Sequence, residues 1–106
     1  MKPLREPTRL ILAAVVDRPR YGYEIIKEVE ELSDGRTRLS PGTLYGALDR
    51  LCDEGTLSKG DEVVVEGRTR RYYEITPEGR QLLSAEMARL EAFAAKYRDR
   101  VGWAAS

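Results

Sequence analysis

Three arginines lie within four residues in the second half of the chain. Arg68, Arg70 and Arg71 follow Gly67 and precede two tyrosines, with no acid among them. Guanidinium groups form charged, bidentate hydrogen bonds with phosphate oxygens, and an arginine on a hairpin tip can also enter a DNA minor groove. Edge strands carry charges for another reason, to prevent pairing with other chains, and acids within residues 61–66 could pair with some of these arginines. Three arginines in so short a segment favour phosphate binding.

A second candidate set lies at the start of a helix expected from Pro41 to about Glu54. Ser40 can cap the free N–H groups of this helix, and proline is well tolerated at its first position. A helix fits a DNA major groove with its first residues against the base edges. Ser40, Thr43 and Tyr45 are then the side chains expected to contact DNA, with a half-buried Tyr45 as the alternative.

The outer face of the same helix carries two glycines. With a period of about 3.6 residues per turn, three leucines gather on the core side, and Gly42, Gly46, Asp49 and Asp53 lie roughly opposite. A glycine inside a helix costs about 1 kcal/mol relative to alanine, so two of them one turn apart require a reason. Close approach to another surface is one such reason. The alternatives are helix initiation at Gly42 and packing against a neighbouring helix at Gly46, and the two aspartates count against a phosphate contact there.

The expected elements are three helices, a hairpin and a long helix. Proline and glycine residues mark the ends of the helices and the turn of the hairpin. Thr76-Pro77 repeats the cap and proline of Ser40-Pro41 and is expected to begin the last helix. This order predicts a mainly α fold with a small β-hairpin, a winged helix-turn-helix with a long C-terminal dimerisation helix. Residues 1–76 are expected to form the DNA-binding domain and residues 77–106 the dimerisation helix, in one compact unit. The expected ranges are Pro7–Asp17, Tyr21–Leu32 and Pro41–Glu54 for the first helices, strands around Val63–Val65 and Tyr72–Ile75, and Pro77–Gly102 for the last helix.

The last helix is expected to project beyond its own domain. From Pro77 to Gly102 it would extend about 39 Å, whereas a small domain is about 30 Å across. Apolar residues recur on it at spacings of four and three, which is a heptad seam, and an exposed seam favours association. A homodimer is therefore expected, with folding of the seam onto its own domain as the alternative. The predicted interface residues are Leu83, Met87, Leu90, Ala94, Tyr97 and Val101.

Composition excludes several classes of protein. The 106 residues leave no room for a catalytic domain beside a binding domain. The chain has no histidine and a single cysteine, Cys52, so no enzyme activity, cofactor or metal site is expected. Cys52 is interpreted as a small buried hydrophobe. The longest apolar run, Leu10–Val16, is too short to cross a bilayer, and the first residues do not resemble a signal peptide. A soluble cytoplasmic protein without a membrane partner is expected.

The formal net charge is zero, from 18 basic and 18 acidic residues. Read alone, this balance argues against a nucleic-acid ligand, because phosphate backbones favour basic proteins. The charges are grouped, however. Residues 1–20, 36–50 and 67–80 are net basic, whereas residues 21–35 and 51–66 are net acidic. Two basic groups coincide with the start of the third helix and with the hairpin, so the balance does not exclude DNA.

Three segments resemble PadR-like transcriptional regulators. Residues 21–27, Tyr-Gly-Tyr-Glu-Ile-Ile-Lys, are similar to the second-helix signature of that family. Residues 41–45, Pro-Gly-Thr-Leu-Tyr, are similar to its recognition helix, and residues 67–76 are similar to its wing. The segments occur in the order of the family, and the single C-terminal helix is similar to the smaller PadR subfamily.

This resemblance implies a dimeric regulator, usually a repressor, that binds a pseudo-palindromic operator in double-stranded DNA. It adds Tyr21 and Tyr23 to the expected DNA-binding residues. Some members of the subfamily release DNA when a small aromatic ligand binds at the dimer interface. The ligand candidates here are Phe93, Tyr97 and Trp103, with Met87 nearby, and plain dimer packing is the alternative. The competing hypothesis is a winged-helix module that binds protein and not DNA, which the balanced charge favours.

Overall fold

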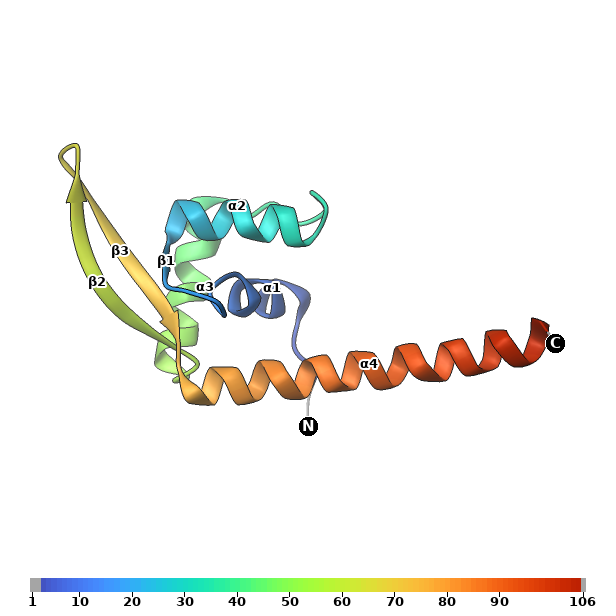
Figure 1. The fold of residues 1–106 in the computed structure, drawn as a ribbon. Helices are drawn as coiled ribbons and strands as arrows, with labels where there is room; N and C mark the ends of the chain where they lie inside the picture. Colours follow the sequence, from blue (N-terminus) through green and yellow to red (C-terminus); the bar gives the residue numbers. More distant parts are fainter. Residues whose placement is uncertain (1–2, 106) are drawn as a thin grey trace.

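Three helices in the first half of the chain form a helix-turn-helix unit (Figure 1). In the computed structural model, which describes residues 3–105 and the side chains up to residue 102, α1 spans Glu6–Ala14, α2 spans Gly22–Leu32 and α3 spans Pro41–Asp53. Helix α1 packs on α2, and α2 packs on α3. The three predicted helices are therefore confirmed.

Helix α1 is shorter than the predicted range, which ended at Asp17. Beyond Ala14, the N–H groups of Val15 and Val16 donate to carbonyls three residues earlier, each at 3.3 Å. Such hydrogen bonds form a tighter turn that seldom continues, and β-branched residues add little to helix stability. The helix therefore ends before Pro19 is reached.

The turn after α2 contains two residues with left-handed backbone conformation. Asp34 has φ 53° and Gly35 has φ 78°, and the N–H of Gly35 donates to the carbonyl of Glu30 at 2.7 Å. This hydrogen bond satisfies a carbonyl at the helix end and stops the helix. The hydroxyl of buried Ser33 donates to the carbonyl of Val29 at 2.8 Å, which fixes the start of the connection to α3.

The wing is a hairpin of β2 (Leu57–Val65) and β3 (Arg68–Ile75), to which a short strand β1 (Arg20–Tyr21) is added. The sheet is antiparallel with the order β1-β3-β2. Glu66 and Gly67, with φ 50° and 76°, form the loop; positive φ at both positions is the type I′ pattern that suits a two-residue hairpin. The predicted hairpin is confirmed, β2 begins earlier than expected, and β1 was not predicted.

The hydrophobic core lies where the helices meet the base of the wing. Leu44, Leu48 and Leu51, predicted to face the core, are buried on α3. They pack with apolar side chains of the other elements. These include Ile11, Leu12, Ile25, Val29, Leu57, Tyr73, Ile75 and Leu83.

Helix α4 spans Pro77–Ala105 and runs past the domain into solvent (Figure 1). The hydroxyl of Thr76 accepts from the N–H of Gly79 at 3.0 Å, which confirms the predicted cap. Gly79 is buried against Thr56, and a β-carbon at position 79 would collide with the Thr56 carbonyl. The molecule measures 63 × 27 × 21 Å, and the projection of α4 accounts for the long dimension.

Candidate nucleic-acid interface

A groove runs between the start of α2, the first half of α3 and the wing. It has a volume of about 420 Å³, and no acidic side chain lines it. Five of the eight predicted DNA-binding residues lie there, together with Thr69, which sequence reasoning missed. The lining residues are Tyr21, Tyr23, Tyr45, Arg68, Thr69 and Arg70. Residues from three separate parts of the sequence therefore form one surface with aromatic and cationic character.

The remaining α3 candidates, Ser40 and Thr43, form the exposed start of the helix. Ser40 Oγ accepts from the Thr43 N–H at 3.2 Å, which confirms the predicted cap. The Ser40 hydroxyl also donates to Thr43 Oγ1 at 3.0 Å. The Thr43 hydroxyl proton is therefore left to donate to another molecule.

Tyr45 reaches from α3 to the first residue of α2. A β-carbon built on Gly22 would lie 2.9 Å from Cζ of Tyr45 and closer still to its hydroxyl. Only glycine at position 22 permits this approach. Tyr45 is nevertheless 47% exposed, so one edge of its ring lies against α2 and the rest is accessible. Gly22 thus permits the position of Tyr45 in the groove, and the Tyr-Gly-Tyr pattern could have indicated it.

Tyr21 has two structural roles, as the last residue of β1 and the N-cap of α2. Its N–H donates to Glu24 Oε1 at 3.3 Å. The guanidinium of Arg70 lies 4.5 Å from the centre of its ring, and the Tyr72 ring meets it edge to face at 5.5 Å. The cation–π contact holds Arg70 toward the groove without neutralising its charge.

The three wing arginines do not share one face. Arg70 lies opposite Val63 and Arg71 opposite Glu62, and neighbouring residues in a strand point to opposite faces. Arg71 is not among the residues that line the groove and forms an ion pair with Glu62. Among the side chains that the structure describes, neither Arg68 nor Arg70 pairs with a carboxylate. Arg68 and Arg70 are therefore the wing arginines whose charge is not offset by an ion pair within the described side chains.

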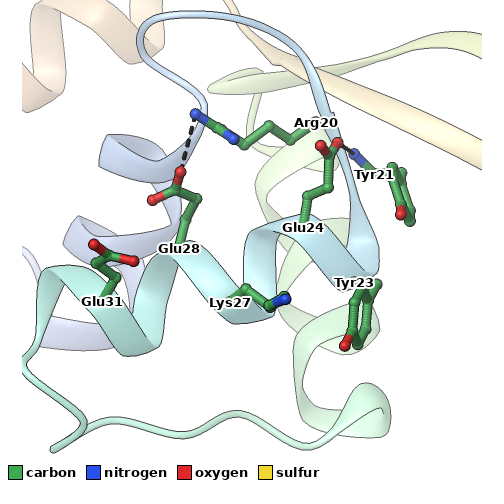
Figure 2. A pocket seen from close by; sticks show the side chains of 7 residues that line it. All are labelled: Arg20, Tyr21, Tyr23, Glu24, Lys27, Glu28 and Glu31. Atoms are coloured by element: carbon green, nitrogen blue, oxygen red, sulfur yellow. Dashed lines mark hydrogen bonds and ion pairs between the residues drawn. The ribbon is translucent and has the colours of Figure 1, made fainter.

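The arginines before α2 are neutralised by acids of that helix. Figure 2 shows Arg20 reaching Glu28, at 3.1 Å, while Tyr21 and Tyr23 lie at the start of α2. Arg18 pairs with Glu24 at 3.1 Å, and Arg20 also pairs with Asp17 at 3.2 Å. The two basic residues next to α2 are therefore paired with acids, and the wing is the cationic side of the groove.

Gly42 and Gly46 face open space. A β-carbon at either position would have no heavy atom within 4 Å, among the atoms that the structure describes. Gly46 is therefore not required for packing against a neighbouring helix, which was one alternative. Asp49 and Asp53 are exposed farther along α3, beyond the residues that line the groove. The surface of the first half of α3 is thus smooth and free of acids.

Helix α4 presents a second exposed surface. Phe93 and Tyr97 are 70% and 62% exposed. Met87 and Val101 are also exposed, whereas Leu90 and Ala94 are half-buried. Leu83, predicted as part of the dimer seam, is instead buried in the core of its own domain, because the first turns of α4 pack against α1 and β3. The side chain of Trp103, a candidate ligand contact, lies outside the described residues.

Other kinds of site find little support in the described part of the chain. Burial raises the pKa of the Cys52 thiol, which opposes the thiolate that a nucleophile requires. Three or more metal-binding side chains are nowhere grouped within the described residues. None of the described helices has the length and apolar content needed to cross a membrane.

A helix-turn-helix with a two-stranded wing and an extended final helix defines a winged-helix protein. Residues 11–85 match the transcriptional regulator PadR-like family, and the chain belongs to this family. Its members are transcriptional regulators and not enzymes, in agreement with the expectation from the sequence.

Individual relatives agree with this assignment. The transcriptional regulator Rv3488 of Mycobacterium tuberculosis is 46% identical over 65 residues, which are 61% of this chain and 60% of that protein. The matched segment thus covers less than two thirds of that relative. The crystal structure of a PadR family transcription regulator from Clostridium difficile is 29% identical, with 89% of this chain and 95% of that chain covered and a TM-score of 0.70. Bacillus subtilis PadR in complex with operator DNA has the same fold, with a TM-score of 0.69 at 22% identity over 78% of this chain and 48% of that chain.

Proposed function

We propose that this protein is a homodimeric, sequence-specific DNA-binding transcriptional repressor that a small-molecule ligand releases from its operator. The observation that carries the proposal is the groove in which three tyrosines and two arginines without acidic partners meet the first half of α3. The operator DNA bound to the structurally similar Bacillus subtilis PadR supports the same ligand class. The cytoplasmic location expected from the sequence belongs to this proposal, because a repressor acts at the chromosome.

The two sides of the groove have different tasks in this proposal. Arg68 and Arg70 contact phosphates and supply affinity that falls with salt. Ser40, Thr43 and Tyr45 lie at or near the start of α3 and contact base edges. The absence of side chains at Gly42 and Gly46 lets the α3 backbone approach the major groove closely.

Dimerisation is assigned to α4 in this proposal, with residues 1–76 as the DNA-binding unit and 77–106 as the dimerisation helix. Exposed apolar side chains on a projecting helix are costly in water and favour association. Met87, Phe93, Tyr97 and Val101 are the exposed side chains that support it. A two-fold dimer presents two recognition helices, which suits a pseudo-palindromic operator.

Ligand release is placed at the same helix. Phe93 and Tyr97 offer aromatic faces on its exposed surface, and such faces stack well on small planar aromatic molecules. Trp103 belongs to the same helix. A ligand held between the two copies of α4 would alter the distance between the DNA-binding units and so weaken their hold on the operator.

Selection of bound duplexes from a random pool tests DNA binding and symmetry together. We expect a recovered pseudo-palindrome, and an affinity for it that falls steeply with salt. Failure to recover any duplex at low salt would reject the proposal in favour of a protein-binding module. For the dimer, sedimentation of Phe93→Glu should show a monomer that still unfolds cooperatively, because Phe93 is outside the core.

A further inference from the structure

A buried carboxylate lies where α4 leaves the domain. Glu86 is 1% exposed, and both of its oxygens accept hydrogen bonds. Oε2 accepts from Arg9 Nη1 of α1 at 3.2 Å and from Arg89 Nη2 at 2.9 Å. Oε1 accepts from Arg89 Nε at 2.8 Å. Arg89 belongs to the same helix as Glu86, whereas Arg9 lies on α1, and the backbone of Leu4, just before α1, also hydrogen-bonds to Glu86.

The first turn of α1 is joined to the helix-turn-helix by two further contacts. Arg9 lies 3.8 Å from Glu6, and Glu6 accepts from the Thr37 hydroxyl in the connection between α2 and α3 at 3.0 Å. The hydroxyl of Thr8 accepts from Arg50 Nη2 of α3 at 3.1 Å. One set of polar contacts thus leads from Glu86 through Arg9 and Glu6 to the connection before α3, and a separate hydrogen bond joins α1 to α3 itself.

Among the α4 side chains that the structure describes, Glu86 is also the last buried one. From Met87 to Gly102, every described side chain is half-buried or exposed. These residues extend about 24 Å at 1.5 Å per residue. A tilt of about 10° at Glu86 therefore displaces the far end by about 4 Å, comparable to the rise of about 3.4 Å between base pairs. A small change in the direction of α4 at Glu86 therefore moves its far end, where the dimer contact is proposed, by about the length of one base-pair step.

We propose that the ion pair between Arg9 and Glu86 fixes the direction of α4 and thereby selects the spacing between the two operator half-sites. The inference rests on the proposed dimeric DNA-binding function. Arg9 and Glu86 are positioning residues, since neither lies in the groove. An apolar contact here would hold α4 with little directional preference, whereas a hydrogen-bonded ion pair has a preferred geometry.

Two variants that each remove one guanidinium from Glu86 provide the test. Arg9→Met removes the guanidinium that links Glu86 to α1, while the matched control Arg89→Met removes a partner within α4 only. Affinity is measured for duplexes whose two half-sites are separated by spacings that increase by one base pair. We expect the native protein and Arg89→Met to prefer one spacing. In Arg9→Met the ratio of affinities for the preferred and the other spacings should fall roughly tenfold, which is the size of effect that a hydrogen bond to a charged group supports.

A distance measurement separates this inference from the proposed function. A nitroxide on Val64→Cys, in a Cys52→Ser background, reports the separation of the two wings in the dimer without DNA. The distribution of distances between the two labels should be narrow for the native protein and Arg89→Met and broad for Arg9→Met. Equal distributions and equal spacing preferences in the two variants overturn the inference while leaving the function intact. The absence of any distance between labels rejects the dimer, and the inference with it. Glu86→Gln, which keeps the size of the side chain, replaces Arg9→Met if that variant fails to fold.

Discussion

The ring of Tyr45 on α3 lies directly against Gly22, the first residue of α2, with no room for a β-carbon between them. Gly22→Ala must therefore displace the ring. Because Tyr45 is exposed on its other side, it can swing outward, and we expect a loss of no more than about 1 kcal/mol of unfolding free energy. The recovered operator sequence should change, because the ring no longer occupies its native position. Thermal unfolding and duplex selection measure the two effects.

Two controls define the effect of Gly22→Ala. In a Tyr45→Ala background the substitution should change neither stability nor sequence preference further, as a double-mutant cycle would show. Gly79→Ala is the contrasting variant, because its β-carbon meets the backbone carbonyl of Thr56 and lies 2.8 Å from Ile75 Cγ1. Because the backbone of Thr56 cannot move aside as a side chain can, Gly79→Ala is expected to lower the free energy of unfolding by about 3 kcal/mol. Equal costs for the two variants would contradict the contact described here.

Gly46→Ala should change stability and DNA binding in opposite directions. The added methyl group faces open space, and the helix gains about 1 kcal/mol from the better propensity of alanine. The same methyl group would hold the helix away from a DNA groove, so affinity for the selected operator should fall. Gly102→Ala is a matched control on α4, also in open space. Unchanged operator affinity in Gly46→Ala would show that α3 does not approach DNA with this face.

The wing arginines should differ in their effect on the salt dependence of binding. Arg68→Ala and Arg70→Ala should each reduce the slope of log affinity against log salt by about 1, as expected for one lost phosphate contact. Arg71→Ala should reduce it less, because Arg71 is paired with Glu62 on the other face of the hairpin. Binding isotherms at several salt concentrations measure the slopes. A larger effect at Arg71 than at Arg68 would contradict the assignment of phosphate contacts to Arg68 and Arg70. Glu62→Gln, which removes the carboxylate partner of Arg71, is a second test of the same assignment.

Glu86 should contribute to stability at neutral pH and lose that contribution in acid. Hydrogen bonds from Arg89, and then from Arg9, lower the pKa of Glu86 to about 2 from an ordinary value of 4.5, against the opposing effect of its burial. Because the folded-state pKa is the lower one, the contribution is complete above about pH 4.5 and is lost as the pH falls toward 2. Urea unfolding should show Glu86→Gln to be less stable than the native protein at pH 7. A difference that stays constant down to pH 2 would contradict this linkage.

Local sequence signals were sufficient for most of the fold. Ser40 and Thr76 are caps with side-chain oxygens that accept the predicted hydrogen bonds, and Gly67 provides the positive φ of the hairpin loop. These features depend on residues within three or four positions of one another. Strand β1 could not be predicted in this way, because Arg20 and Tyr21 pair with Tyr73 and Tyr72 far along the chain.

Most members of the candidate site were predicted, but Thr69 and Gly22 were missed, and the arrangement was not predicted. The sequence grouped Arg68, Arg70 and Arg71 as one cationic tip, whereas strand alternation and the acid at position 62 separate Arg71 from the others. Heptad spacing alone does not distinguish a seam residue from a core residue, and Leu83 is buried because of how α4 docks. Both differences arise from contacts between elements, which no local pattern encodes.

Because Tyr21 ends a strand and also begins a helix, the wing is mechanically coupled to α2. A force on the hairpin passes through β3 into Tyr21 and reaches the helix axis without crossing a flexible linker. A duplex that pushed the wing aside would therefore also have to rotate α2 and, through Gly22, disturb Tyr45. The groove should thus behave as a rigid binding surface. It should favour duplexes whose shape already fits it over duplexes that the protein must deform.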